Sequence, residues 1–195
     1  RAGKGPMRSR NGYGVWAALC MALPVSLLAQ KVVDQWRYTL EPPQGAWQAA
    51  AYDDAAWKQG NGGFGTVSTP GARVGTVWRT KTIWLRKRVP LAGTLKKPAL
   101  LVHHDEDAEF FLNGQRVLAL KGYLTDYKVV PLAEEHRALV KPGENLLSVF
   151  CKQETGGQFI DAHLVDADQV PALPTPEREI FRSALITPWG EQVTD

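Results

Sequence analysis

Cysteine is scarce in this sequence, and so is an excess of charge of one sign. Its 195 residues include two cysteines, which excludes a small disulfide-stapled domain and a cysteine-rich zinc site. The net charge of +3 comes from the N-terminus, because residues 1–29 hold four basic residues and no acid. The remainder carries 23 − 4 = 19 basic and 20 acidic residues, a net charge of −1. A nearly neutral body lacks the basic surface that nucleic acid requires, so we expect no nucleic-acid partner.

A sustained helical period is also missing. No segment repeats its apolar residues with the spacing of a helix, and strands do not alternate with helices, so a Rossmann fold or a parallel barrel is not favoured. Helix is expected only as one turn at residues 52–57 and one or two turns at residues 132–140. The chain is 44% hydrophobic and 22% charged, which excludes a disordered, collagen-like or coiled-coil protein.

The N-terminal segment has the features of a secretory signal peptide. Basic residues precede an uncharged apolar run at residues 13–29, and the run ends in Ala29. The alternative is a membrane anchor, but the run is short for a spanning helix and contains Pro24. We therefore expect residues 1–29 to comprise upstream residues and a signal peptide. Cleavage after Ala29 would leave a secreted or periplasmic protein with no membrane contact.

Between residues 30 and 166 the sequence predicts an all-β sandwich. Short runs rich in Val, Ile, Leu and aromatic residues are separated by turn signals, as in strands with one buried face. Asn113-Gly114 is the strongest of these signals, since it suits a two-residue hairpin turn. This number of strands fits a jelly roll, with two antiparallel sheets packed face to face. The expected strands are 36–40, 83–89, 99–104, 108–113, 115–120, 127–132, 145–153 and 158–166.

Three other features concern the organisation of the chain. The glycine-rich segment 60–80 is long enough to be a functional loop, or else a structural crossover between sheets. Cys151 shares a strand face with apolar residues, which indicates a small buried side chain and not a catalytic thiol. Residues 167–182 are predicted to be a linker, and residues 183–195 the truncated start of a following domain.

Several motifs occur in an order that is typical of one family. The first strand is followed by Asp53-Asp54-x-x-Trp57, and Trp84-Leu85-Arg86 opens a later strand. Asn113-Gly114, then Gly122 to Tyr127, then Pro142-Gly143-Glu144-Asn145 come next. Together they resemble the galactose-binding-like jelly roll of glycoside hydrolase family 2, over roughly residues 34–166. Residues 185–191, LITPWGE, resemble the lead-in to the next domain of β-galactosidase-like members.

The resemblance implies the N-terminal part of a longer secreted glycoside hydrolase. Catalysis in that family uses two glutamates from a downstream barrel, one as general acid/base and one as nucleophile. No barrel fits within this sequence, so we assign no catalytic residue here, and the downstream catalytic domain of the same polypeptide becomes an expected partner. We also expect no cofactor.

The most concentrated polar feature is the segment His103-His104-Asp105-Glu106-Asp107. In an extended chain His103, Asp105 and Asp107 share one side. Three interpretations stay open: a polar turn whose acids cap backbone N–H groups and pair with Arg79, Arg86 or Lys152, a sugar contact, or a metal site. We assign no metal ligand.

Sugar sites combine aromatic faces with carboxylates and amides. Trp78, in the glycine-rich segment, is the preferred aromatic platform, whereas Trp36, Trp57 and Trp84 are expected in the core. Gly156-Gly157 allows close backbone approach or simply makes a turn. The predicted ligand-binding set is Trp78, His103, Asp105, Asp107, Tyr123 and Gln158, with Tyr127 and Asp161 as further contacts.

Three functions follow from these features. The first is a non-catalytic carbohydrate-binding or accessory module of a secreted glycoside hydrolase. The second is a purely structural sandwich that packs on the catalytic body without a ligand. The third is an independent enzyme, which is least favoured because no nucleophile elbow, zinc motif or paired-carboxylate spacing is present.

Overall fold

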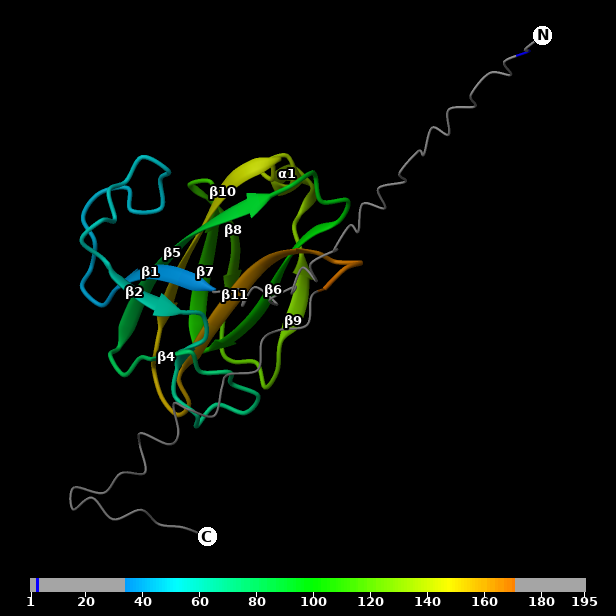
Figure 1. Cartoon of the computed structure of the whole chain (residues 1–195). Helices are drawn as coiled ribbons and strands as arrows, with labels where there is room; N and C mark the ends of the chain where they lie inside the picture. Colours follow the sequence, from blue (N-terminus) through cyan, green and yellow to red (C-terminus); the bar gives the residue numbers. More distant parts are fainter. Residues whose placement is uncertain (1–2, 4–33, 171–195) are drawn as a thin grey trace. The chain divides into compact units, whose positions relative to one another are not determined.

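The computed structural model describes residues 34–170, together with Gly3. The predicted signal peptide, the linker from 171 onwards and the start of a following domain lie outside the described residues. The described part is a β-sandwich of two sheets, which confirms the predicted all-β class (Figure 1). Of the described helices, none is long and apolar enough to cross a membrane.

The six-stranded sheet has the order β2-β1-β5-β10-β7-β8 and is antiparallel throughout. Long apolar strands at its centre make the longest ladder, in which β10 pairs with β5 over ten residues on each strand. The strands are β1 (Gln35–Thr39), β2 (Lys58–Asn61), β5 (Thr82–Leu91), β7 (Asp107–Leu112), β8 (Gln115–Leu120) and β10 (Gly143–Lys152).

The five-stranded sheet has the order β4-β3-β11-β6-β9, with β3 and β4 parallel and the other pairs antiparallel. From β5 onwards the chain passes repeatedly from one sheet to the other, as in a jelly roll. The strands are β3 (Phe64–Gly65), β4 (Thr76–Val77), β6 (Pro98–Asp105), β9 (Lys128–Pro131) and β11 (Phe159–Asp166).

The core lies between the sheets and follows the alternation of each strand. On β11 the inward residues Ile160, Ala162 and Leu164 join the main apolar cluster, so the residues between them face outward. Trp36 and Cys151 are also in this cluster, as predicted, and burial raises the pKa of the Cys151 thiol. An inert, protonated thiol is the consequence.

The predicted turn at Asn113-Gly114 is confirmed. Both residues have positive φ, 50° and 90°, and they join β7 to β8. The expected helical turn at 132–140 is also present as α1 (Glu134–Arg137), but residues 52–57 form turns without helix. The segment 60–80 contains the short strands β3 and β4, so it is a crossover locked into the five-stranded sheet.

Candidate functional site

The polar segment 103–107 is divided between the two sheets. His103, His104 and Asp105 end β6 in the five-stranded sheet, whereas Asp107 begins β7 in the six-stranded sheet. The expectation that His103, Asp105 and Asp107 share one side is therefore wrong. The alternation of a strand does not continue across a change of sheet.

His103 is fully buried on the outer face of the five-stranded sheet. Its Nε2 lies 3.1 Å from the carbonyl oxygen of Leu124, and its ring packs against Tyr127 and Phe159 with centroids 5.2 and 4.9 Å away. Burial lowers the pKa of His103, and the bond to Leu124 opposes that shift only in part. A neutral, enclosed imidazole holds the 121–127 loop and has no access to a sugar.

Asp105 is also buried, and its partner is a side chain of the glycine-rich crossover. Thr69 donates its hydroxyl to Asp105 Oδ2 over 2.9 Å. A Cβ on Gly157 would overlap both Asp105 Oδ2 and Thr69 Oγ1, so glycine is required for this close approach. The approach allowed by Gly156-Gly157 is thus toward the protein's own side chains.

Asp107 is half-buried and caps a turn. Its two carboxylate oxygens accept from Lys121 Nζ at 2.5 Å and from the N–H of Gly122 at 3.2 Å, and the Lys121 bond lowers the Asp107 pKa. The capping part of the polar-turn interpretation fits this geometry. Two of the expected cations have other ion-pair partners, Arg86 with Asp54 and Lys152 with Glu154, although the charge of Lys152 also helps to lower the Asp107 pKa.

Two other predicted ligands are structural side chains. Trp78 is 1% exposed and lies in the core, with its Nε1 donating to Thr80 Oγ1 over 2.9 Å. It offers no ring face for a sugar, so the platform assignment is wrong. Gln158 is 9% exposed and donates to the Thr80 carbonyl over 2.6 Å, which fixes the end of the crossover.

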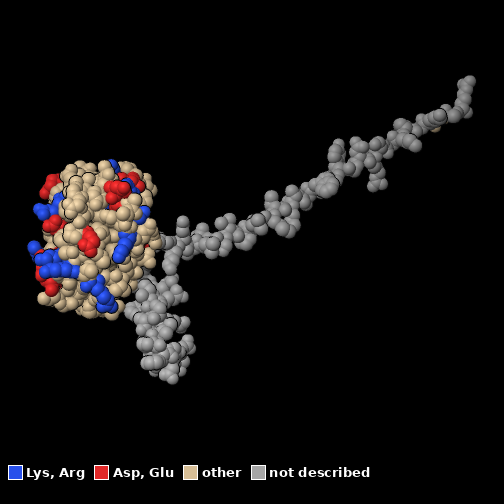
Figure 2. Space-filling view, turned by 90° about the vertical axis from the view of Figure 1, so that its left-hand side faces the viewer, with Lys and Arg blue, Asp and Glu red and all other residues tan. Residues whose placement is uncertain are grey.

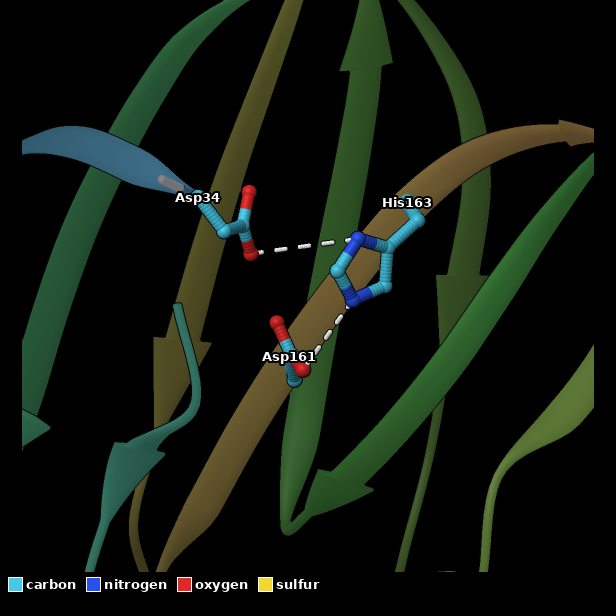
Figure 3. Close-up of side chains that lie close together, drawn as sticks. All are labelled: Asp34, Asp161 and His163. Atoms are coloured by element: carbon cyan, nitrogen blue, oxygen red, sulfur yellow. Dashed lines mark hydrogen bonds and ion pairs between the residues drawn. The ribbon is translucent and has the colours of Figure 1, made fainter. Parts of the chain in front are cut away.

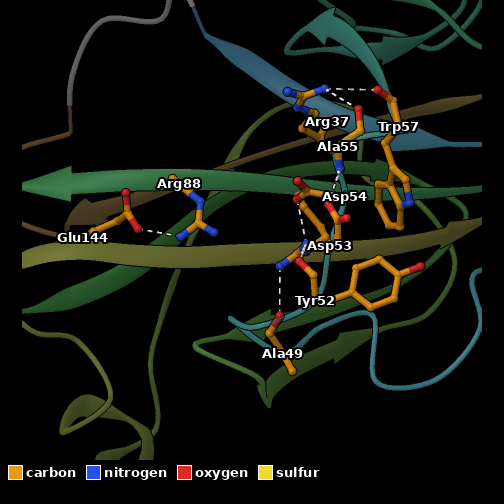
Figure 4. Close-up of polar contacts among 10 residues, drawn as sticks. Arg37, Ala49, Tyr52, Asp53, Asp54, Ala55, Trp57, Arg88 and Glu144 are labelled. Carbon is orange, nitrogen blue, oxygen red and sulfur yellow. Dashed lines mark hydrogen bonds and ion pairs between the residues drawn. The ribbon is translucent and has the colours of Figure 1, made fainter.

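The motif residues around Arg86 fasten a long loop, residues 41–57, over the outer face of the six-stranded sheet (Figure 4). The Arg86 guanidinium donates to the carbonyls of Tyr52 (3.0 Å) and Ala49 (2.9 Å) and to Asp54 Oδ2 (2.6 Å). Asp53 accepts from the N–H of Ala55 over 2.9 Å and so shapes the turn. This loop carries Trp57, which therefore covers the sheet from outside. Trp84, on β5, also faces outward, against Phe150. The expectation that Trp57 and Trp84 lie in the core is therefore wrong.

A second pair of motifs closes the opposite turn. Asn145 is 1% exposed, and its side chain bonds to the backbone of Lys141 and Gly143 across the turn. Asn113 donates to Asn145 Oδ1 over 3.1 Å and accepts from the N–H of Leu146 over 2.8 Å. The Asn-Gly and Pro-Gly-x-Asn motifs are thus one hydrogen-bonded unit that joins two turns.

A buried ionic cluster lies where β1 begins beside β11 (Figure 3). His163 Nε2 is 3.1 Å from Asp161 Oδ2, and its Nδ1 is 3.8 Å from Asp34 Oδ2. Tyr127 donates its hydroxyl to Asp161 over 2.6 Å, and Lys87 forms an ion pair with Asp34. The cluster therefore joins four separate segments of the sandwich.

The electrostatics of this cluster favour the ionised form of Asp161. Burial opposes ionisation of Asp161, but the bonds and charge from His163, with the bonds from Tyr127 and the Ala162 N–H, outweigh burial and lower its pKa. Burial also raises the pKa of Tyr127 and lowers that of Lys87. The ligand atoms of Asp34, Asp161 and His163 lie within 4.8 Å of one another, a spacing that one metal ion spans. Lys87 already supplies a cation to Asp34, so the arrangement works as an ion-pair network.

Sequence reasoning found only part of this cluster. Asp161 and His163 are two residues apart on one strand, which places them on one face, and Lys87 interrupts an otherwise apolar face of β5. A lysine in that position signals a buried partner. Asp34 carries no such signal, because its contact to β11 depends on the packing of the two sheets.

Tyr123 is the most exposed of the predicted ligand residues. Its side chain is 68% exposed and borders a hollow of about 390 Å³ between the end of β8 and β9. The exposed Lys121 and Lys128 also line this hollow, with the Lys121 amino group bound to Asp107, and its less exposed lining includes His104 and Leu124. Burial lowers the His104 pKa, so that imidazole is neutral.

Charge is mixed on the side of the molecule that faces the reader in Figure 2. Acidic and basic side chains lie near one another there, among uncharged surface. The described residues form a two-sheet β-sandwich, and an open hollow lies beside the exposed ring of Tyr123.

Comparisons with solved structures return glycosidases. The chain is similar to a β-glycosidase from Bacteroides vulgatus (15% identity, TM-score 0.46), covering 69% of this chain and 20% of that one. It is similar to a glycosyl hydrolase family 2 member from Bacteroides cellulosilyticus DSM 14838 (18%, 0.48), again covering 69% and 20%. A Bacteroides uniformis β-glucuronidase gives 16% identity and a TM-score of 0.45, covering 68% and 17%. The chain spans about a fifth of the length of these proteins. No protein-family model and no curated protein matches the chain.

Proposed function

We propose that this chain is the non-catalytic sandwich domain of a secreted, β-galactosidase-like glycoside hydrolase, and that it binds carbohydrate in the hollow beside Tyr123. The order of motifs from Asp53 to Asn145 supports the family. The exposed ring of Tyr123 on the rim of the hollow is the observation that carries the binding role. A phenol ring packs against the apolar face of a sugar, while the neighbouring amino groups donate to its hydroxyls.

The catalytic role belongs elsewhere in the polypeptide. In this family the two glutamates come from a barrel that follows the sandwich. Asp54, Asp105 and Asp161 instead bond to other side chains of the same domain, which supports this assignment. We expect no turnover of nitrophenyl galactosides by this chain. Hydrolysis that survives repurification would contradict the proposal.

Binding is tested by affinity electrophoresis against immobilised polysaccharides and by a glycan array. Tyr123→Ala is expected to weaken binding by about tenfold, since an aromatic contact contributes about 0.5–1.5 kcal/mol beyond its buried area. The matched control is Val77→Ser, which removes another exposed apolar side chain away from the hollow. It is expected to bind normally.

A purely structural domain is the second candidate. It is favoured by one observation, namely that Trp78, Asp105 and Gln158 all bond to the protein itself. In that case neither the parent chain nor the two variants retain any glycan, and the hollow beside Tyr123 is an incidental surface feature. Equal binding by the parent and Tyr123→Ala would exclude the hollow as the binding site.

A further inference from the structure

A second hollow, of about 360 Å³, opens on the six-stranded sheet where β1 separates from β5. The two strands pair from Arg37 opposite Arg86 to Thr39 opposite Trp84. Gln35 and Trp36, the first two residues of β1, have no partner on β5. From Lys87 to Leu91, β5 pairs only with β10. The hollow therefore lies against a break in backbone pairing.

The side chains around this hollow are predominantly cationic. Its lining includes Arg37, Arg86, Lys87 and Arg88 but a single acid, Asp54. Arg37 bonds only to backbone carbonyls, through Nη1, among the contacts that the described residues show. Arg88 pairs with Glu144, but both side chains are more than half exposed, so that pair is weak and exchangeable. Among the described residues Arg37 is the cation of this hollow without a carboxylate partner, since Arg86 pairs with Asp54, Lys87 with Asp34 and Arg88 with Glu144.

One buried hydrogen-bond donor on the outer face lacks an acceptor. Arg86 Nε has no partner within residues 34–170, and Arg86 lines the hollow, whereas the orphaned Trp36 Nε1 belongs to the core side of β1. The Arg86 side chain is fully buried. An unsatisfied buried donor is costly, and an acceptor that entered the hollow would remove that cost.

We infer that this basic hollow binds an oxyanion group, a carboxylate or a sulfate. Both groups present several acceptor oxygens to guanidinium donors, which form short, charge-assisted bonds with them. If the domain binds carbohydrate, the natural carrier is an acidic sugar. That last step rests on the proposed function, whereas the anion site itself does not.

Titration calorimetry at constant ionic strength tests the site with inorganic sulfate, glucuronate and galactose as separate probes. The wild-type chain is expected to bind sulfate and glucuronate at this hollow. Galactose is not expected to bind there. Arg88→Gln is the main variant, because Arg88 does not hold the 41–57 loop. The matched control is Arg116→Gln, because Arg116 is another exposed arginine of the same sheet and also pairs with a glutamate. Loss of one charged donor is expected to weaken anion binding by about tenfold in Arg88→Gln. Binding by the control should be unchanged.

Three outcomes decide the inference. Absence of sulfate and glucuronate binding by the wild type, or equal binding by both variants, overturns it. Sulfate binding without glucuronate binding keeps the anion site and removes the acidic sugar. Arg37→Gln serves as a second variant, and its thermal unfolding is measured to check that it is folded. Because Tyr123→Ala leaves this hollow intact, anion binding that survives in that variant separates the anion site from the proposed carbohydrate site.

Discussion

The outer faces of the two sheets use buried charge in opposite ways. On the six-stranded sheet a cation, Arg86, donates to the backbone of the 41–57 loop. On the five-stranded sheet the anions Asp105 and Asp161 accept from Thr69 and Tyr127, which belong to other loops. In both cases a charged strand residue fixes a loop across the sheet. A polar residue in a buried strand is therefore better interpreted as a loop anchor than as a ligand.

The largest expected effect comes from removing the cationic anchor. Arg86→Met leaves Asp54 and two carbonyls without their donor, and breaking a buried pair in this way costs about 3–5 kcal/mol. Urea unfolding measures the loss, with Arg116→Met as the control, which should change the free energy of unfolding by less than about 0.5 kcal/mol. Equal values for the two variants would remove Arg86 as an anchor.

A smaller loss is expected on the other sheet. Asp161→Asn keeps the shape of the side chain but removes a charge that faces His163 and Lys87, at a cost of about 1.5–3 kcal/mol. Since the folded-state pKa of Asp161 is lowered, its contribution is present above the ordinary value of 3.8 and is lost as the pH falls through the lower folded value. The difference in stability between wild type and Asp161→Asn should therefore shrink as the pH falls below 3.8, and wild type should begin to unfold in acid at no higher a pH than the variant. Glu154→Gln is an exposed control.

The buried histidines give the next effect. Burial lowers the pKa of both His103 and His104, so the unfolded chain binds more protons than the folded chain as the pH falls below the ordinary value of 6.5. Melting temperature should decrease from pH 7 to pH 5. His103→Gln should flatten that dependence, whereas His136→Gln, on α1, should leave it unchanged. A parallel decrease in both variants would contradict the assignment to the β6 histidines.

The sandwich and its hairpin were predictable because they depend on local patterns. The alternation that predicted the strand at 158–166 is the one that turns Ile160 inward and Asp161 outward, and Asn113-Gly114 specified its own turn. The motif residues near Arg86 were recognised as a group, although their role as a loop lock became visible only from the contacts. Strand alternation and the hairpin turn depend on residues that are close together in the chain, so they can be predicted from the sequence.

The ligand set could not be predicted in the same way. Trp78 resembles a platform because glycines surround it, yet the crossover folds its ring into the core. His103 and Asp107 are separated by the change of sheet at Glu106, which strand alternation does not reveal. Asp34 meets Asp161 only through the packing of distant segments. Exposure, which decided between Trp78 and Tyr123, is a property of the tertiary structure.

The smallest expected effect completes the comparison within one short segment. Asp107 differs from Asp105 in exposure, because its pair with Lys121 is at the surface and its other bond is to the Gly122 N–H. Exposed pairs are screened by water and contribute about 0–1 kcal/mol, so Asp107→Ala should lower the free energy of unfolding by about 0.5 kcal/mol. Asp105→Ala leaves the buried Thr69 hydroxyl without its acceptor and should cost about 1–3 kcal/mol.

Both variants are compared by urea unfolding, and glycan affinity is measured in parallel. An unchanged affinity in both, with a larger loss of stability in Asp105→Ala, is the result expected of two loop anchors of unequal burial. A loss of affinity in Asp107→Ala without a loss of stability would instead make Asp107 a sugar contact next to Tyr123.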